Sequence, residues 1–170
     1  VVSMGTGTSF VKGEDGKIQH IGGIGIGGGT IQGLSRLLLK THDIHQVVEM
    51  AQKGIVENID LQIKDICNAA LPGLPLNATA STFGKADSNS SLEDVAAGII
   101  HMVLQSIGQS VILAALNSSI KDFVLIGNLA KLPQCKEVFP IMEEMYQCHF
   151  LIPEYAQYRT ALGAALAYVH

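Results

Sequence analysis

The 170-residue sequence contains little charge, few aromatic residues and no cluster of basic side chains. Charged residues make up 15% of the chain, the formal net charge is −4 at pH 7, and Arg36 and Arg159 are the two arginines. Because proteins that bind nucleic acid gather arginine and lysine on one surface, this composition argues against a nucleic-acid partner. Hydrophobic residues account for 48%. This content allows one domain with a core and excludes an intrinsically disordered chain.

Cysteine is also scarce and follows no pattern. Cys67, Cys135 and Cys148 are odd in number and form no Cys-x-x-Cys motif, as expected of reduced thiols in a cytoplasmic protein. No signal peptide is recognisable. The most apolar region, 95–116, is interrupted by His101 and other polar residues. We therefore expect it to form a buried helix and not a membrane span.

Motifs of several enzyme classes are absent from the sequence. No Gly-x-Ser-x-Gly elbow is present, which argues against a serine hydrolase. Five of the histidines share no metal-ligand spacing with cysteines or carboxylates: His42, His45, His101, His149 and His170. The sequence therefore predicts no metal site. The sequence shows no internal repeat and no interdomain linker, so we expect one domain over residues 1–170.

Glycine, in contrast, is abundant near the amino end. A short apolar strand, 1–4, runs into the turn Gly5-Thr6-Gly7-Thr8-Ser9, and a second strand runs into residues 22–29, which hold six glycines and open a helix. Glycine lets a backbone approach a ligand closely, and turn amides together with a helix N-terminus supply N–H donors. Both segments therefore predict an anion site that suits nucleotide phosphates. The alternatives are a tight hairpin for the first segment and close helix–strand packing for the second.

Hydrophobic periodicity and turn residues predict an α/β chain with a mixed sheet. We expect strands at 1–4, 8–12, 18–21, 123–127 and 149–152, with an Asp-Gly hairpin at 14–17. We expect helices over 29–40, from Asp43 to Gly54, from a Ser90 N-cap to 116, over 133–145 and over 159–168. The apolar face of the first helix would hold Ile31, Leu34, Leu37 and Leu38. Residues 58–81 are hard to place, apart from a rigid turn at 71–75.

These segments resemble type II pantothenate kinases, which belong to the superfamily of actin, hexokinase and chaperone ATPases. The likeness covers essentially the whole chain, because further short motifs follow in the order of that family: 32–34, 50–54, 58–61, 83–84, 124–128 and 161–164. The resemblance implies a mixed-sheet, ribonuclease-H-like domain, the second domain of an actin/hexokinase-like ATPase fold. It also implies ATP-dependent phosphorylation of pantothenate to 4'-phosphopantothenate, the first step of coenzyme A biosynthesis.

The resemblance also implies roles for particular residues. It places nucleotide contacts in two stretches, the first with Gly5, Thr6, Gly7, Thr8 and Ser9 and the second with Gly28, Gly29, Thr30, Ile31 and Gln32. It also implies an adenosine turn at Gly127 and Asn128 and an adenine contact at Ile44. His20 stands where the family has an arginine that would bind pantothenate and stabilise charge during transfer. A histidine there implies weaker charge stabilisation or a changed substrate. The alternatives are a strand-ending turn for Gly127, a core residue for Ile44 and an ordinary strand residue for His20.

Family members begin with another domain, which holds an Asp-x-Gly-Gly-Thr phosphate loop and the glutamate thought to act as general base. Neither motif occurs here, so we expect a C-terminal domain that is inactive on its own. The resemblance implies ATP and Mg²⁺ as cofactors, a homodimer built on the long apolar helix, and regulation by coenzyme A thioesters. Two alternatives remain open: another small-molecule kinase of the same superfamily, or a non-catalytic module for nucleotide binding or dimerisation.

Overall fold

The computed structural model describes residues 1–67, 69 and 72–168. These residues form two compact units. Unit 1 comprises residues 1–30 and 105–170, and unit 2 comprises residues 31–104. His170 and Leu71, which begins the predicted rigid turn, lie outside the described residues.

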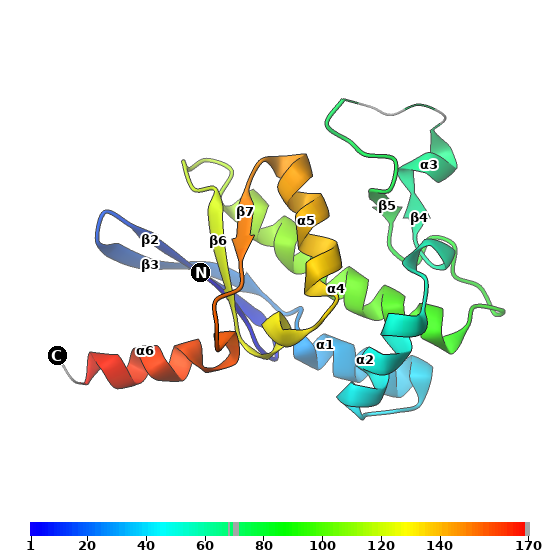
Figure 1. Ribbon diagram of the computed structural model, residues 1–170, viewed down its shortest axis with the longest axis horizontal. Helices are drawn as coiled ribbons and strands as arrows, with labels where there is room; N and C mark the ends of the chain where they lie inside the picture. The colour runs from blue at the N-terminus through cyan, green and yellow to red at the C-terminus, as the bar shows by residue number, and fades with distance from the viewer. Residues whose placement is uncertain (68, 70–71, 169–170) are drawn as a thin grey trace. The chain divides into compact units, whose positions relative to one another are not determined.

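Unit 1 is built on a mixed five-stranded sheet with the order β3-β2-β1-β6-β7 (Figure 1). Its strands are β1 (Val2–Met4), β2 (Thr8–Glu14), β3 (Lys17–Ile24), β6 (Asp122–Ile126) and β7 (His149–Leu151). Strands β1, β2 and β3 pair antiparallel, whereas β6 pairs parallel with both β1 and β7. Asp15 and Gly16 join β2 to β3 with positive φ angles of 51° and 73°. These angles are those of the predicted Asp-Gly hairpin. The predicted α/β class with a mixed sheet is thus confirmed.

The core of unit 1 lies against one face of this sheet. Helix α5 (Cys135–Tyr146) places Phe139 on Phe150 of β7, with ring centroids 4.7 Å apart, and Phe150 stacks on Phe123 of β6 at 5.3 Å. Along β6, Phe123 and Leu125 are buried, whereas Val124 is only half-buried. The second face of this strand is therefore incompletely covered.

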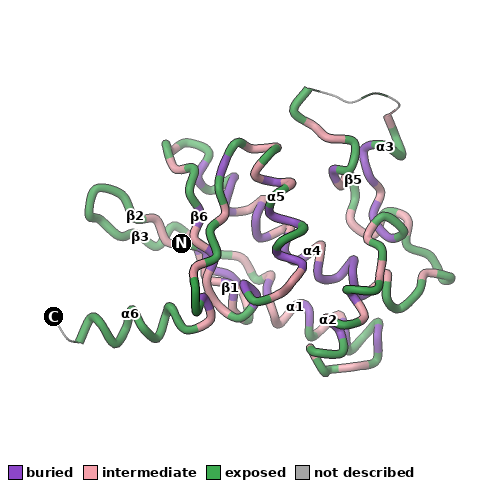
Figure 2. The backbone as a smooth tube through the Cα atoms, in the orientation of Figure 1, coloured by how far each residue is buried: buried purple, intermediate pink, exposed green. Residues whose placement is uncertain are grey.

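Two short segments complete unit 1. The 3-10 helix η3 (Asn128–Lys131) follows β6, and a second one, η4 (Ala156–Tyr158), leads into the final helix α6 (Arg159–Ala167). Figure 2 shows α6 exposed along its whole length, and none of its residues is buried.

Unit 2 is mainly helical. Helix α1 (Gly28–Leu34) continues into the π-helix η1 (Ser35–Leu39), followed by α2 (Ile44–Lys53) and the 3-10 helix η2 (Val56–Asn58). A two-stranded antiparallel sheet pairs β4 (Leu61–Gln62) with β5 (Thr79–Ser81), and α3 (Ile63–Ile66) follows β4. The sequence left this sheet unplaced because strands of two and three residues carry no readable periodicity. The long helix α4 (Leu92–Ala114) contributes residues to both units.

The π-helix changes which residues of the first helix are buried. Ser35 and Leu39 are buried, whereas Leu37 and Leu38 are 67% and 47% exposed, so the expected apolar face is wrong beyond Leu34. The wider hydrogen-bond spacing of a π-turn rotates the later side chains relative to a regular helix. Such a change of helix type leaves no clear mark in the hydrophobic pattern.

The predicted start of α2 is confirmed, and that of α4 is shifted by one residue. The Asp43 carboxylate accepts the His45 N–H at 2.9 Å, as an N-cap does. At α4, however, Ser91 Oγ accepts the Asp94 N–H at 3.0 Å, while Ser90 Oγ accepts from the Asp87 N–H. The expected N-cap at Ser90 is therefore wrong, because the Ser90 hydroxyl accepts a hydrogen bond from the preceding turn.

Helix α4 is long and apolar enough to cross a membrane by length and composition alone, but 61% of its most hydrophobic window is buried inside the structure. Ile99, Ile100 and Leu104 of this helix have no exposed surface. This burial is that of a core helix, as the sequence predicts.

Candidate functional site

Two of the predicted turns meet in unit 1. The first, Gly5–Gly7, connects β1 to β2, and the second connects β3 to α1. The Gly28 N–H donates to the Gly5 carbonyl at 2.8 Å, and the Gly29 N–H donates to the Thr6 carbonyl at 2.9 Å. The buried Thr8 hydroxyl ties the same two segments together, because it donates to the Ile26 carbonyl at 2.8 Å. The two glycine-rich segments therefore form one bonded cluster.

The glycines of the second turn are needed for this close approach. A Cβ atom on Gly27 would lie 2.6 Å from the Thr6 carbonyl oxygen and 2.8 Å from that of Gly5, and one on Gly29 would lie 2.9 Å from Thr6 Cγ2. These separations are too short for any side chain. Close packing against the backbone of the first turn thus accounts for glycine at position 27. A Cβ on Gly25, in contrast, would meet nothing within 4 Å.

A third turn, at the end of β6, joins the cluster. Gly127 has a φ of +95°, and a Cβ there would overlap the Met4 carbonyl at the end of β1. The Leu129 side chain lies 3.7 Å from the Cβ position of Gly28. The cluster therefore sits at the carboxyl ends of the two parallel strands β1 and β6, which is where open α/β sheets bind their ligands.

The hydrogen bonds of the cluster decide which donors remain for an anion. The amides of Gly28 and Gly29 bond to carbonyls of the first turn, and the Gly27 N–H points to Thr30 Oγ1 at 3.2 Å. Among the residues that the structure describes, the N–H groups of Thr6 and Gly7 have no hydrogen-bond acceptor. Thr6 is exposed. The N–H groups of Thr6 and Gly7 therefore remain free to donate to a ligand.

The other predicted nucleotide contacts lie in different surroundings. Asn128 is exposed and begins η3. Ile31, Gln32 and Ile44 belong to unit 2, where Ile31 is fully buried, Gln32 is exposed and Ile44 is half-buried at the start of α2. The Ile31 side chain is thus a core residue. Ser9 follows Thr8 on β2 and is half-buried.

His20 lies on β3, where it pairs with Val11 of β2, and it is exposed. It is separated from the turn by the bulge at Phe10 and Val11. In sequence it precedes Gly22, whose φ of +140° continues this irregularity. The structure thus places His20 on the hairpin and not within the bonded cluster.

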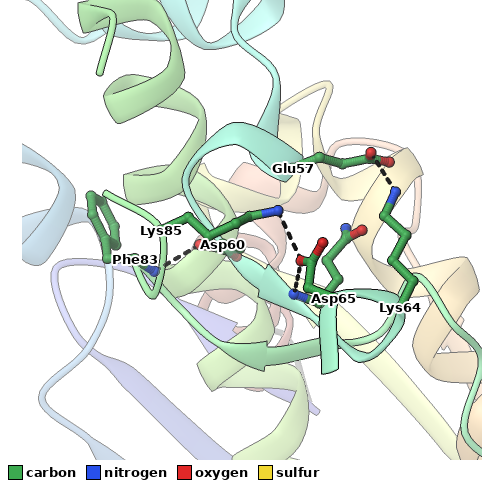
Figure 3. Close-up of polar contacts among 7 residues, drawn as sticks. Glu57, Asp60, Lys64, Asp65, Phe83 and Lys85 are labelled. Carbon is green, nitrogen blue, oxygen red and sulfur yellow. Dashed lines mark hydrogen bonds and ion pairs between the residues drawn. The ribbon is translucent and has the colours of Figure 1, made fainter. Parts of the chain in front are cut away.

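Unit 2 contains a polar hub that sequence analysis missed. The fully buried Asp60 carboxylate accepts the Phe83 N–H at 2.8 Å, as Figure 3 shows, and its second oxygen lies 2.8 Å from Nδ1 of His101. An ionised carboxylate only accepts, so this contact is a hydrogen bond in the tautomer whose Nδ1 carries the proton. The hub joins residues 41 positions apart in sequence, and no local pattern could have predicted it.

Two exposed ion pairs surround β4. Lys85 Nζ lies 2.8 Å from Asp65, and Lys64 Nζ lies 2.6 Å from Glu57 (Figure 3). The hydrogen bond from Lys85, followed by that from the Gln62 N–H, holds the pKa of Asp65 below its usual value. Both lysines are matched by carboxylates, so this surface offers little positive charge to an anion.

The side chains of Cys135 and Arg159 both donate hydrogen bonds to backbone carbonyls. Burial raises the pKa of the Cys135 thiol to about 12, and Cys135 Sγ donates to the Leu129 carbonyl. This thiol therefore stays protonated and unreactive at neutral pH. The Arg159 Nε–H donates to the Glu154 carbonyl at 3.0 Å. Arg159 thus bonds back to the residues that precede η4.

Comparison with known proteins agrees with the sequence motifs. A family model described as Fumble matches residues 1–166, nearly the whole chain. The chain belongs to the Fumble family. This membership confirms the likeness to type II pantothenate kinases, because the relatives of the chain include proteins of that name.

Three relatives illustrate the range of named activities. The chain is 41% identical over 115 residues to 4'-phosphopantetheine phosphatase of Mus musculus, covering 64% of this chain and 14% of that protein. It is 36% identical over 137 residues to pantothenate kinase 2 of Arabidopsis thaliana, covering 75% and 15%. It is 32% identical over 131 residues to type II pantothenate kinase of Bacillus cereus (strain G9842), covering 75% and 48%. The chain thus spans less than half of each of these relatives.

Proposed function

We propose that this chain supplies the nucleotide-binding part of a kinase that phosphorylates pantothenate to 4'-phosphopantothenate. The observation that carries the proposal is the bonded cluster of three turns at the carboxyl ends of β1 and β6. Fumble-family membership and the relatives named pantothenate kinase support the substrate. The parent fold would be the ribonuclease-H-like second domain of an actin/hexokinase-like ATPase.

In this proposal the first turn holds the phosphates. The free amides of Thr6 and Gly7 donate to phosphate oxygens, and the hydroxyls of Thr6 and Ser9 add further donors. Bonds from Gly28 and Gly29 hold the carbonyls of this turn in place, so the second turn positions the first. Phosphoryl transfer depends mainly on such positioning and on charge neutralisation.

ATP would bind as its Mg²⁺ complex, because the first turn offers N–H and hydroxyl donors but no carboxylate to hold the ion. Gly127 and Asn128 at the end of β6 would contact the nucleoside. The general base would come from the part of the family's length outside these 170 residues. A cytoplasmic homodimer built on α4 and control by coenzyme A thioesters complete the proposal.

A second candidate function is a non-catalytic module for nucleotide binding or dimerisation. One observation favours it. His20 replaces the arginine expected from the family resemblance and lies exposed on the hairpin. A kinase of the superfamily with another small-molecule substrate would also accommodate His20.

A pair of glycine substitutions tests the nucleotide site. Gly27→Ala forces the two turns apart, because its Cβ has no room between the Gly5 and Thr6 carbonyls, whereas Gly25→Ala adds a methyl group in open space. Calorimetry with ATP and Mg²⁺ should give weak, millimolar binding to the chain and to Gly25→Ala, and loss of binding in Gly27→Ala. Equal affinity of the two variants would contradict the proposed site, and micromolar affinity of the chain alone would contradict its dependence on a second domain.

A reconstitution experiment tests the reaction. The chain is joined to the amino-terminal half of the Bacillus cereus relative, and ADP release is measured with pantothenate and with a panel of other small hydroxyl compounds. Pantothenate-dependent ADP release supports the kinase. Release with another acceptor alone refutes the substrate, and the absence of release despite ATP binding supports the non-catalytic module. The His20→Arg variant should increase pantothenate-dependent release if the cationic side chain is needed.

A further inference from the structure

Tyr155 has an unusual backbone conformation. It precedes η4 with φ 56° and ψ 34°, in the left-handed region, although it is a bulky residue and not glycine. Such a conformation is an outlier for a large side chain, and it persists only where the surrounding structure holds it. The Tyr155 side chain nevertheless remains 60% exposed, so packing of the ring in a core does not account for it.

Neighbouring bonds hold this conformation against the candidate site. The next residue, Ala156, is buried, and its carbonyl accepts the Gly127 N–H at 3.0 Å. On the other side, the Tyr155 carbonyl accepts the Tyr158 N–H at 2.8 Å. Gly127 in turn packs on the Met4 carbonyl, immediately before the phosphate turn. Tyr155 is therefore fixed one residue from the turn that joins the anion donors to the end of β6.

We propose that Tyr155 is a stacking platform for the base of the bound nucleotide and makes this site prefer nucleotides over phosphate alone. The inference rests on the function proposed above. It follows from the juxtaposition of free amide donors at the end of β1 with an exposed aromatic side chain held on strained backbone beside the end of β6. Phosphates on Thr6 and Gly7 leave a nucleoside to extend along these strand ends, where a π-face is available.

Two probes separate base recognition from phosphate recognition. The full 170-residue chain is titrated with ATP and Mg²⁺, and separately with inorganic tripolyphosphate and Mg²⁺, while NMR follows the amides of Thr6 and Gly7. The chain should bind ATP more tightly than tripolyphosphate. Tyr155→Ala should weaken ATP binding about 5-fold to about 150-fold, the range for loss of one aromatic stack, and leave tripolyphosphate binding unchanged. Tyr155→Phe should bind ATP like the original chain.

A glycine variant separates stacking from a purely structural role. Tyr155→Gly suits the left-handed backbone, so it should raise the thermal midpoint while weakening ATP binding as much as Tyr155→Ala does. The matched control is Tyr168→Ala, which removes a tyrosine that is 93% exposed at the end of α6 and should change neither probe.

Each remaining outcome has one reading. If Tyr155→Ala and Tyr155→Gly both bind ATP as tightly as the original chain, or if the original chain binds ATP and tripolyphosphate equally, Tyr155 is no platform and the nucleotide site stands without it. If neither probe shifts the Thr6 and Gly7 amides, the proposed function itself fails and the inference falls with it.

Discussion

The Asp60 hub makes the strongest prediction about stability. Asp60→Ala removes the acceptor of the Phe83 N–H and the partner of His101 Nδ1, each 2.8 Å away. The side chain of Asp60 is fully buried and that of His101 is 15% exposed, so water can replace little of what is lost. An unpartnered buried donor costs about 1–3 kcal/mol, and Asp60→Ala leaves two such donors, the Phe83 N–H and Nδ1 of His101. We therefore expect a loss of about 3–4 kcal/mol in the free energy of unfolding.

Urea unfolding followed by circular dichroism measures the total loss, and amide exchange of Phe83 reports it locally in unit 2. Asp60→Asn keeps one carbonyl acceptor for the Phe83 N–H and should lose about half as much. The matched control, Asp122→Ala, alters an exposed aspartate of unit 1 and should change stability by less than about 0.5 kcal/mol. A loss below about 1 kcal/mol for Asp60→Ala, or unchanged exchange of Phe83, would refute the reasoning.

The remaining predictions concern packing, pH and thiol reactivity. Gly98→Ala should destabilise unit 2 by about 1–3 kcal/mol, because its Cβ would lie 2.7 Å from an Ile59 methyl carbon. The control, Gly163→Ala, also lies within a helix but in open space. It should stabilise the chain by about 0.5–1 kcal/mol in the same urea assay. Hydrogen bonding from the Ile55 N–H lowers the pKa of Asp94. The Asp94 carboxylate therefore stabilises the fold above its unfolded pKa of about 3.9, and this stabilisation is lost as pH falls through the folded pKa. Asp94→Asn should therefore reduce stability at pH 7 and have no effect near pH 2, and an equal loss at both pH values would contradict this. With a pKa of about 12, Cys135 should resist iodoacetamide at pH 8 until urea unfolds the chain, and mass spectrometry of native samples modified at that thiol would contradict its burial.

Much of the local structure could be predicted because its causes lie close together in sequence. The β2–β3 hairpin follows from Asp15 and Gly16, and the start of α2 follows from Asp43 and its bond two residues away. The N-cap of α4 was predicted at Ser90, but Ser91 is the residue that caps the helix. The Ser90 hydroxyl instead accepts the Asp87 N–H in the preceding turn. The π-helix likewise escaped prediction, since a change of helix type is set by packing.

The candidate site shows the same division. Its small-residue turns and their likeness to a kinase family could be read from composition and order, and the family is confirmed over residues 1–166. The direction in which the amides of the second turn point could not be read from the sequence. Whether an N–H of the second turn faces a ligand or a protein carbonyl depends on the backbone opposite, which here is the Gly5–Thr6 turn more than twenty residues earlier.

The sequence by itself thus determined the family, the α/β class and the glycine-rich turns, because these depend on residue types and short-range spacing. Only the tertiary structure decided that Gly28 and Gly29 support the first turn, that Asp60 meets His101, and that Tyr155 is held in a left-handed conformation beside Gly127. Each of these depends on hydrogen bonds between segments that are distant in the chain, and such bonds acquire their geometry only when the chain has folded.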